Sequence, residues 1–283
     1  RFTHKDAIGG MTSIIVFTHN RIEQTKKCLK SIQKHTAENH EIIFIDNNSS
    51  DNTVKWLEGQ IRKNENYCVI GNKESVGFVK ARNQGIEASR GEYILLLDND
   101  AVVSEGWLSG MLECLAYAPD SGIIGPMTNR ADGLQQVGDE SYRSVDYLDK
   151  YAAQFKKQYR HRRIHYRKIT GFCILFKRSL VEKIGLMDDR FGAGEFADED
   201  FCWRAVLEGH LNYIAGDVFI HRQGNKEAGG DRSVIDKKWT LSTASPEGKK
   251  LAVIKATEWA DTYNAKGEIN RAVEALVNCI KFS

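Results

Sequence analysis

The sequence predicts an α/β protein: a Rossmann-like mixed β-sheet, followed by a small C-terminal α-helical hairpin. Short apolar runs alternate with amphipathic stretches over about the first hundred residues, which is typical of βαβ units. The run at 93–97 is apolar throughout, as expected for a central strand that is buried on both faces. Toward the end of the chain, small residues recur at helical spacing, which predicts a separate helical unit.

The expected elements follow one another along the chain. Ser104 is expected to cap the helix that carries Trp107 and Leu115, because a Ser hydroxyl can accept a hydrogen bond from a free N–H of the first turn. Residues 128–167 show no clear period. Strands are predicted at 12–17, 41–45, 67–70, 93–97, 171–176 and 211–214, and helices near 22–32, 54–61, 76–89, 179–184 and 199–208.

Three units are expected: a main domain at 11–225, a connecting loop at 226–245 and a helical hairpin at 246–283. Ser245-Pro246-Glu247 is a favourable helix start, since proline fits the first turn and glutamate favours its positive end. The hairpin resembles one tetratricopeptide repeat, with an ordinary helical hairpin as the alternative. A lone repeat cannot bury both faces, so it would pack on the main domain or begin an array.

Composition excludes few classes of protein, but the cysteine pattern indicates the cellular compartment. A formal net charge of +2 over 283 residues gives no overall argument for a nucleic-acid partner, and none is expected. The six cysteines are scattered and contain no C-x-x-C pair, which indicates buried thiols in a reducing compartment. No apolar run of about 18 residues and no signal-peptide pattern occur. The protein is therefore expected in the cytoplasm, with peripheral contact to a membrane left open.

Polar residues follow four of the predicted strands. Ligands of an open parallel sheet bind outside the carboxyl ends of its strands. Turn chemistry explains Asn, Ser and Asp at any one of these ends, but does not readily explain all four together. The sequence therefore predicts a ligand site along this edge, formed by Thr18-His19-Asn20-Arg21, Asp46-Asn47-Asn48-Ser49-Ser50-Asp51, Gly71-Asn72-Lys73 and Asp98-Asn99-Asp100.

Asp98-Asn99-Asp100 is the most informative of these segments. Two carboxylates after a buried strand supply the oxygen ligands that Mg²⁺ or Mn²⁺ prefers, and such an ion commonly completes its coordination with phosphate oxygens and water. An Asp-x-Asp alone is a weak signal, because it occurs often in loops. A phosphatase of the haloacid-dehalogenase type uses Asp-x-Asp after its first strand, completed by a Thr two residues on, where this chain has Val102.

Five segments in order resemble the successive motifs of family 2 glycosyltransferases, across roughly residues 11–224. The resemblance implies the A-type glycosyltransferase fold, a nucleotide-diphosphate-sugar donor, a divalent cation and inversion at the anomeric carbon. The segments are Thr18-His19-Asn20-Arg21, Asp46 to Asp51, Gly77-Phe78 with Ala81-Arg82-Asn83, Asp98-Asn99-Asp100, and Asp198-Glu199-Asp200-Phe201-Cys202-Trp203-Arg204.

The same resemblance implies roles for individual residues in donor binding. Thr18 and Asn20 would line the nucleotide pocket, and Asp46 would hydrogen-bond the uracil ring. Asn72 would lie near the base, and Arg82 near the diphosphate or the donor sugar.

The metal would lie at the other end of the donor. Asp98, with Asn99, would contact the ribose or the sugar, and Asp100 would hold the metal. His221 matches a histidine that the family often places after the last strand of the domain, so it is a second expected metal ligand, although a lone histidine is more often structural.

The acidic run is where the resemblance places the catalytic base. Direct displacement needs a carboxylate that takes the proton of the acceptor hydroxyl. The family pattern selects Asp198, with Glu199 as the fallback, and gives Asp200 an orienting or helix-capping role. Ala197 stands where the family often has Glu, which leaves the base uncertain by one or two residues. The alternative is an acidic helix N-terminus without chemistry.

The predicted function is transfer of a sugar from a nucleotide-diphosphate donor, expected to be a UDP-sugar, to a hydroxyl of a glycan or protein. Mn²⁺ or Mg²⁺ would assist departure of the nucleotide diphosphate. One alternative is a nucleotidyltransferase, although 18–21 lacks the expected glycines. Another is a repeat-containing adaptor on an inactive domain. The helical tail suggests a protein partner, and the basic segment 156–168 is either a solvated face or a mobile segment that meets an acidic acceptor.

Overall fold

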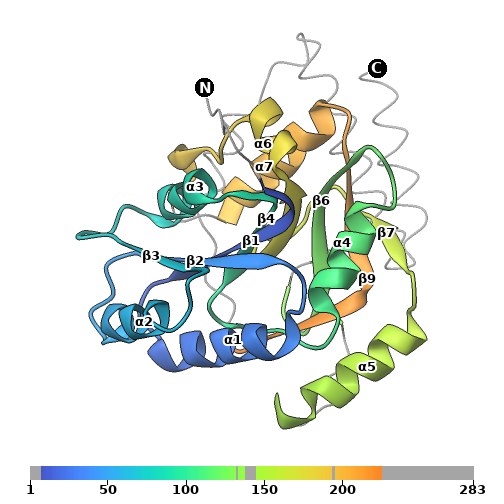
Figure 1. Cartoon of the computed structure of the whole chain (residues 1–283). Helices are drawn as coiled ribbons and strands as arrows, with labels where there is room; N and C mark the ends of the chain where they lie inside the picture. Colours follow the sequence, from blue (N-terminus) through green and yellow to red (C-terminus); the bar gives the residue numbers. More distant parts are fainter. Residues whose placement is uncertain (1–7, 132, 138–144, 193–194, 225–283) are drawn as a thin grey trace.

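The structure is a computed structural model that describes residues 8–131, 133–137, 145–192 and 195–224. The predicted connecting loop and helical hairpin at 226–283 lie outside these residues. Within the described part, a mixed sheet of nine strands is covered by helices on both faces (Figure 1), which confirms the predicted fold class. No helix in these ranges is both long and apolar enough to cross a bilayer.

The sheet combines a parallel half and an antiparallel half. β3, β2, β1 and β4 are adjacent and parallel, and β8 continues the sheet antiparallel to β4. The order from edge to edge is β3-β2-β1-β4-β8-β6-β9-β5, and β7 also pairs with β9. The strands are β1 Ile8–Thr18, β2 His40–Asp46, β3 Tyr67–Gly71, β4 Gly91–Asp98, β5 Ala101–Val102, β6 Ser121–Thr128, β7 Arg163–His165, β8 Cys173–Lys177 and β9 Leu211–Arg222.

Helices pack on the two faces of this sheet. Along β1, Ile14 and Val16 belong to one core and Ile15 to the other, because successive side chains of a strand point to opposite faces. This explains why the strands read as unbroken apolar runs. One core includes α1 Ile22–His35, α2 Thr53–Ile61 and α4 Trp107–Leu115, and the other includes α3 Phe78–Ala88, α5 Leu148–Gln158, α6 Arg178–Ile184 and α7 Glu195–Leu207.

Strand register brings the polar strand ends together. Thr18 pairs with Asp46 on β2, and Phe17 pairs with Asp98 on β4. Asp46 in turn pairs with Gly71 on β3. The three loops that follow β1, β2 and β4 therefore start side by side at one edge of the sheet.

One local prediction was wrong, and one segment without a predicted structure proves to be partly regular. Ser104 does not cap α4: its Oγ donates to the carbonyl of Phe219 at 3.2 Å, and the helix begins after Gly106, which has a left-handed φ of 70°. Residues 128–167 also contain regular structure, since α5 buries Leu148 and Phe155 and β7 pairs with β9. The buried residues of α5 recur at helical spacing in the sequence, but the many charged residues between them hide this short apolar face.

Two elements have different bounds from those expected. β9 continues from Leu211 to Arg222 because it pairs first with β6 and then with β5, so His221 lies inside the strand. α7 begins at Glu195, so the acidic run at 198–200 lies within the helix and not just before it.

Gly85 allows α3 to lie directly on the sheet. A Cβ at this position would overlap the Ile15 side chain and lie 3.2 Å from Cγ1 of Ile45. We expect Gly85→Ala to lower the free energy of unfolding by about 1–3 kcal/mol, since an overpacked core must shift.

Urea denaturation measures this change. The control is Gly59→Ala on α2, where a Cβ meets no atom within 4 Å, and the better helix propensity of Ala should leave stability unchanged or raise it by up to about 1 kcal/mol. Equal effects of the two substitutions would contradict this account of α3 packing.

Candidate functional site

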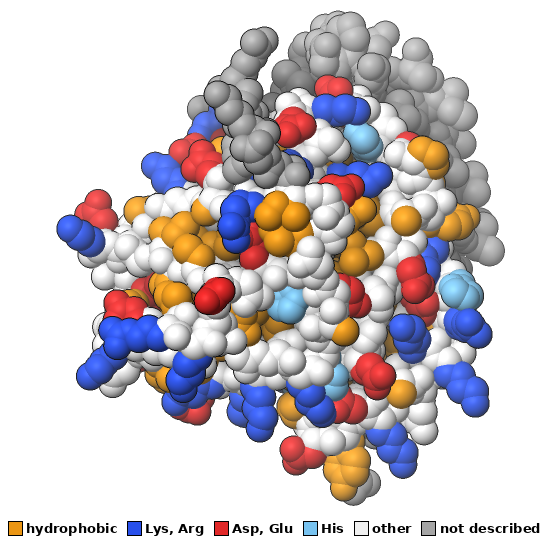
Figure 2. All heavy atoms as spheres, viewed as in Figure 1, with side chains coloured by type: hydrophobic (Ala, Val, Ile, Leu, Met, Phe, Trp, Pro, Cys, Tyr) orange, Lys and Arg blue, Asp and Glu red, His pale blue; other side chains and the backbone are white. Residues whose placement is uncertain are grey.

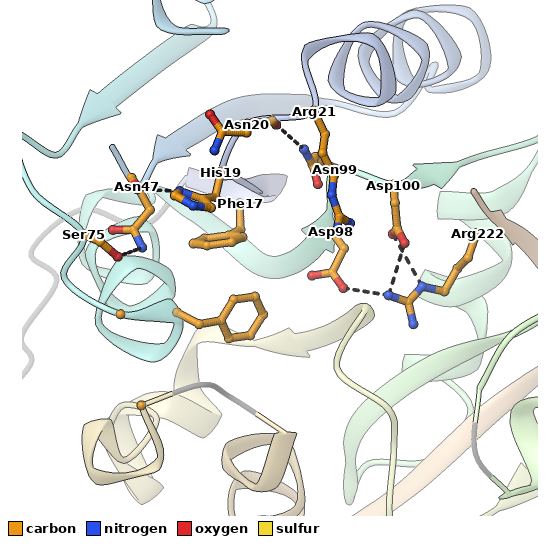
Figure 3. A pocket seen from close by; sticks show the side chains of 13 residues that line it. Phe17, His19, Asn20, Arg21, Asn47, Ser75, Asp98, Asn99, Asp100 and Arg222 are labelled. Carbon is orange, nitrogen blue, oxygen red and sulfur yellow. Dashed lines mark hydrogen bonds and ion pairs between the residues drawn. The ribbon is translucent and has the colours of Figure 1, made fainter. Parts of the chain in front are cut away.

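A cavity of about 560 Å³ opens where the carboxyl ends of β1, β2 and β4 meet. Figure 3 shows amide and hydroxyl groups at one end, two phenylalanine rings in the middle and carboxylates with an arginine at the other end. Its size suits a small-molecule ligand. The lining residues are Phe17, His19, Asn20, Arg21, Asn47, Ser75, Gly77, Phe78, Asp98, Asn99, Asp100, Gly192 and Arg222.

The loop after β1 has an unusual backbone conformation. Asn20 and Arg21 are both left-handed, with φ of 59° and 62°. Asn20 is held by the neighbouring loop: its N–H donates to Ser49 Oγ at 2.7 Å, and its side-chain oxygen accepts from the Ser50 N–H at 2.8 Å. These bonds between loops offset the cost of the left-handed residues and present Asn20 to the cavity.

Asp46 is turned inward. Its side chain is fully buried and accepts hydrogen bonds from Thr18 Oγ1 at 3.1 Å, from the Ser49 N–H at 2.9 Å and from Ser49 Oγ at 2.5 Å. From this loop, Asn47 lines the cavity instead. The expected contact of Asp46 with a nucleotide base stays a prediction. In this structure, the Asp46 and Thr18 side chains stabilise the loop after β2.

Asn47 is fixed by its neighbours. Its side-chain Nδ2 donates to Ser75 Oγ at 3.0 Å, and its Oδ1 accepts from the Val76 N–H at 3.0 Å and from Asn72 Nδ2 at 3.3 Å. Asn72 thus lies behind Asn47 and is not one of the lining residues. Amide groups held in this way form a preorganised polar end of the cavity.

Phe17 and Phe78 form the apolar middle of the cavity. Their ring centroids are 4.6 Å apart in an edge-to-face arrangement, and the Arg82 guanidinium lies 4.0 Å from the centroid of Phe78. A flat apolar surface between two polar ends suits a ligand whose charged and hydrogen-bonding groups are at its ends.

Arg82 joins two of the predicted functional carboxylates. Its Nη2 donates to Asp98 Oδ1 at 2.7 Å and to the Gly171 carbonyl at 2.7 Å, and its Nη1 donates to Asp198 Oδ1 at 2.9 Å. Arg82 itself is 1% exposed. A side chain at 171 would overlap the Asp198 carboxylate, so glycine is required there. The sequence predicted Asp98 and Asp198 separately, and Arg82 brings them into one network.

Asp98 and Asp100 also share a second arginine. Arg222 Nη2 lies 3.3 Å from Asp98 Oδ2 and 3.3 Å from Asp100 Oδ2 (Figure 3). Asn99 lies between them in sequence and lines the cavity, while its Nδ2 donates to Thr25 Oγ1 at 2.9 Å. All three residues of the segment are therefore held by contacts beyond their own loop.

Burial changes the acidity of both Arg82-linked carboxylates. Burial raises the pKa of Asp198 to about 6, although the Arg82 charge opposes this rise. Burial also raises the pKa of Asp98, while Arg82 and Arg222 lower it and the Asp100 charge raises it further. A carboxylate with a pKa near 6 is ionised at neutral pH and is a stronger base than an ordinary aspartate.

The other acids of the α7 run have structural partners. Glu199 is buried and lies 2.9 Å from Lys168 Nζ, and Asp200 is fully buried and accepts from Arg204 Nε at 2.9 Å. Asp198 is the member of this run that is bound to the Arg82 network. This geometry favours Asp198 over Glu199 as the base, and both assignments stay predictions.

The residues at this end of the cavity fit a divalent cation that also binds phosphate. Asp98 and Asp100 supply oxygen ligands, and Mg²⁺ is usually held by one or two carboxylates with phosphates and water. Among the described residues, no three His, Cys, Asp or Glu side chains gather as a metal site. Alternation along β9 directs Arg222 to the carboxylates and His221 to the other face, so the His221 ligand also stays a prediction.

Comparison with known proteins decides the family. The family model "Glycosyl transferase family 2" matches residues 13–185. The chain belongs to glycosyltransferase family 2. This confirms the resemblance carried by the five motifs, and the family match covers four of the five.

Relatives in the family are considerably longer than the matched part. EpsH of Bacillus subtilis is 28% identical over 214 residues, which cover 74% of this chain and 60% of EpsH. The poly-beta-1,6-N-acetyl-D-glucosamine synthase of Staphylococcus aureus is 25% identical over 210 residues, which cover 72% of this chain and 48% of the synthase. The chain thus spans about half the length of these relatives.

Solved structures support the fold. The mannosyltransferase PcManGT from Pyrobaculum calidifontis, in complex with GDP-Man and Mn²⁺, has a TM-score of 0.59 at 16% identity, covering 96% of this chain and 73% of its own. GalNAc-T7 with UDP, GalNAc and Mn²⁺ has a TM-score of 0.63 at 14% identity, covering 88% of this chain and 51% of its own. Such identities show a common fold, that of the A-type glycosyltransferases.

Several lining residues of this family 2 member were missed at the sequence level. Phe17 and Phe78 were treated as strand and helix residues, and Arg222 was passed over beside His221. Ser75 lies in a polar loop whose composition alone looks like turn chemistry, whereas Asn47 was part of the predicted ligand-binding edge and only its individual role was missed. Only the strand register, which is not readable from one sequence, brings these side chains to one cavity.

The basic segment 156–168 contains regular secondary structure. It comprises the last turn of α5 and β7, and Arg163 Nη1 donates to the buried Asp217 at 3.0 Å. β7 pairs with residues 213–215 of β9, far along that strand from Arg222. On the face in Figure 2, Lys and Arg side chains are interspersed with Asp and Glu. Both earlier interpretations of this segment, a solvated face and a mobile segment that meets an acidic acceptor, stay predictions.

The raised pKa of Asp198 predicts a pH-dependent stability. Between the ordinary Asp value and about 6, the folded protein binds a proton at Asp198 that the unfolded chain has released, so stability falls as pH rises through this window. Asp198→Asn lacks this loss. Its free energy of unfolding relative to wild type should therefore increase by about 2–3 kcal/mol from pH 4 to pH 7.

Urea denaturation in a chelating buffer measures the difference. Glu23→Gln, which removes a carboxylate from the exposed ion pair with Lys26 on α1, is the control and should vary by less than about 1 kcal/mol. A relative stability of Asp198→Asn that stays constant with pH would contradict the shifted pKa.

Proposed function

We propose that this chain is an inverting glycosyltransferase that moves a sugar from a nucleotide-diphosphate donor, a UDP-sugar, to a hydroxyl of a glycan or protein. The observation that carries the proposal is the shared Arg82 guanidinium, which holds Asp98 at the cavity and Asp198 on α7 in one network. A carboxylate that lines the cavity is thereby joined through one guanidinium to a base candidate that lies behind the cavity wall.

The shape of the cavity supports a nucleotide-diphosphate-sugar. The base and ribose would bind at the end formed by Asn20, Asn47 and Ser75, whose amide and hydroxyl groups can pair with ring nitrogens and oxygens. Phe17 and Phe78 would contact the apolar faces of the ribose or base. The diphosphate would then extend toward Asp98 and Asp100.

The uridine assignment rests on the family motif and not on the fold. The two structural neighbours are in complex with GDP-Man and with UDP, so one fold accommodates different bases. In this chain, Asp46 is engaged by Thr18 and Ser49, and Asn47 is the residue of that loop that lines the cavity. We assign base selection to Asn20 and Asn47 together.

Asp198 would act as the base. Its carboxylate is ionised at neutral pH, and the Arg82 guanidinium and the Gly171 backbone N–H both bind and orient it, so that it could take the proton of an acceptor hydroxyl that reaches it. Attack on the anomeric carbon from the side opposite the diphosphate gives inversion.

A divalent cation, Mn²⁺ or Mg²⁺, would be held by Asp100 with Asp98 in support. When bound, it supplies positive charge to the leaving diphosphate. Arg82 binds one oxygen of Asp98 and one oxygen of Asp198, which fixes the orientation of both carboxylates.

The family match favours this function over the nucleotidyltransferase and the inactive adaptor. The acids that an inactive domain would lose are present and engaged: Asp98, Asp100 and Asp198. The cytoplasmic location, the peripheral membrane contact and the protein partner stay predictions.

Donor binding is the first test. Calorimetry should detect UDP binding that requires Mn²⁺, and Asp100→Asn should weaken it by at least about tenfold, because a cation ligand is lost. Asp149→Asn, far from the cavity on α5, should bind UDP as the wild type does. If a folded wild-type protein binds no UDP with or without Mn²⁺, the uridine assignment is wrong, and GDP or dTDP donors or the adaptor function would be tested next.

The base is tested by a pH profile. With a donor identified, kcat/KM should rise as Asp198 ionises, with a midpoint near pH 6. Asp198→Asn should lower kcat by about 10²–10⁴-fold, while Glu199→Gln, which removes the charge paired with Lys168, should cost less than about tenfold if its role is structural. The reverse order of effects would assign the base to Glu199.

A further inference from the structure

Arg222 covers the carboxylates that a cation would need. It is the last residue of β9, and pairing with Ala101 of β5 places it directly beside Asp100. Its Nη2 lies 3.3 Å from an oxygen of Asp98 and 3.3 Å from an oxygen of Asp100, and its Nε lies 3.4 Å from the second oxygen of Asp100. One guanidinium thus bridges both carboxylates (Figure 3).

The two arginines of the site are held differently. Arg82 has a side chain that is 2% exposed and makes bonds of 2.7–2.9 Å to Asp98, Asp198 and Gly171. Arg222 has a side chain that is 16% exposed, lines the cavity and makes longer contacts of 3.3–3.4 Å. The Arg222 guanidinium also packs over the Phe172 ring, 5.0 Å from its centroid. Arg82 is therefore enclosed in the core, while Arg222 lies at the cavity wall with its head group partly open to the cavity.

A divalent cation and this guanidinium cannot occupy the same place. Both bind the oxygens of Asp98 and Asp100, and their like charges repel strongly at short range. A cation that enters must move the Arg222 head group. The long side chain would keep the displaced guanidinium within the cavity, beside the position proposed for the diphosphate, and a guanidinium pairs with phosphate oxygens in a two-pronged geometry.

We infer that Arg222 is a displaceable counterion: it neutralises Asp98 and Asp100 when no cation is bound, and it turns to bind the donor diphosphate when a divalent cation takes its place. This inference rests on the proposed function. It makes cation and donor binding cooperative, because the cation must break the Arg222 contacts and the diphosphate offers that guanidinium a new partner. The coupling is reciprocal by thermodynamic linkage.

The test separates the two roles of Arg222 by binding measurements. Mn²⁺ affinity without nucleotide is measured by electron paramagnetic resonance of free Mn²⁺, and UDP and uridine affinities at saturating Mn²⁺ are measured by calorimetry. Arg222→Gln should bind Mn²⁺ at least about tenfold tighter than wild type, since a competing charge is gone. It should bind UDP at least about tenfold weaker, with uridine affinity unchanged.

Two further variants make the result specific. Arg222→Lys keeps the charge but cannot bridge both carboxylates, so its Mn²⁺ affinity should fall between those of wild type and Arg222→Gln. Arg162→Gln, which removes a positive charge that is stacked on Tyr159, should leave all three affinities at wild-type values. Circular dichroism spectra and unfolding curves would show that each variant is folded.

The failures are distinguishable. If Arg222→Gln binds Mn²⁺ no tighter than wild type while wild type binds both Mn²⁺ and UDP, displacement is wrong and the proposed function stands. An unchanged UDP affinity would likewise reject the diphosphate role alone. If the wild-type protein binds neither UDP nor Mn²⁺, the proposed site and this inference both fail. They also fail if the Asp100→Asn variant binds Mn²⁺ with the same affinity as the wild-type protein.

Discussion

The buried guanidinium of Arg82 is the interaction on which the site depends. It connects β4 through Asp98, α7 through Asp198 and the segment before β8 through the Gly171 carbonyl. Two carboxylates that are 100 residues apart in sequence could not be buried side by side without such a partner, because an uncompensated buried charge costs several kcal/mol. The same contact therefore stabilises the packing of α7 against the sheet and holds a base candidate beside the donor site.

The rest of the scaffold supports this contact by bringing strand ends together. The parallel register of β1, β2 and β4 aligns three loops, and their hydrogen bonds to one another hold Asn20 and Arg21 in left-handed conformations. Glycine at 85 lets the helix that carries Arg82 lie on the strands, and glycine at 171 leaves room for Asp198. Strained loops and carboxylates of raised pKa are features that a protein retains at a functional site at some cost in stability.

The sequence predicted what depends on local pattern and failed where distant segments decide. The apolar runs of β1, β2 and β4 identified the sheet, and the polar strand ends marked the edge where the cavity lies, with Asp98 and Asp100 among its lining residues. The inward position of Asp46 and the pairing of Arg222 with both aspartates follow from strand register and β5–β9 pairing, which one sequence does not reveal. The start of α7 was misplaced because glycines and acids at 192–200 look like a loop.

The charges of the site explain why cation and donor should enter together. Three carboxylates, Asp98, Asp100 and Asp198, share two guanidiniums, Arg82 and Arg222, so the cluster holds more acidic groups than basic ones. A diphosphate would be repelled by this cluster alone, and a lone cation would have to displace Arg222. When both arrive, the cation satisfies the aspartates and Arg222 satisfies the phosphate. Asp198, kept away from this exchange by Arg82, then remains ionised for the acceptor hydroxyl.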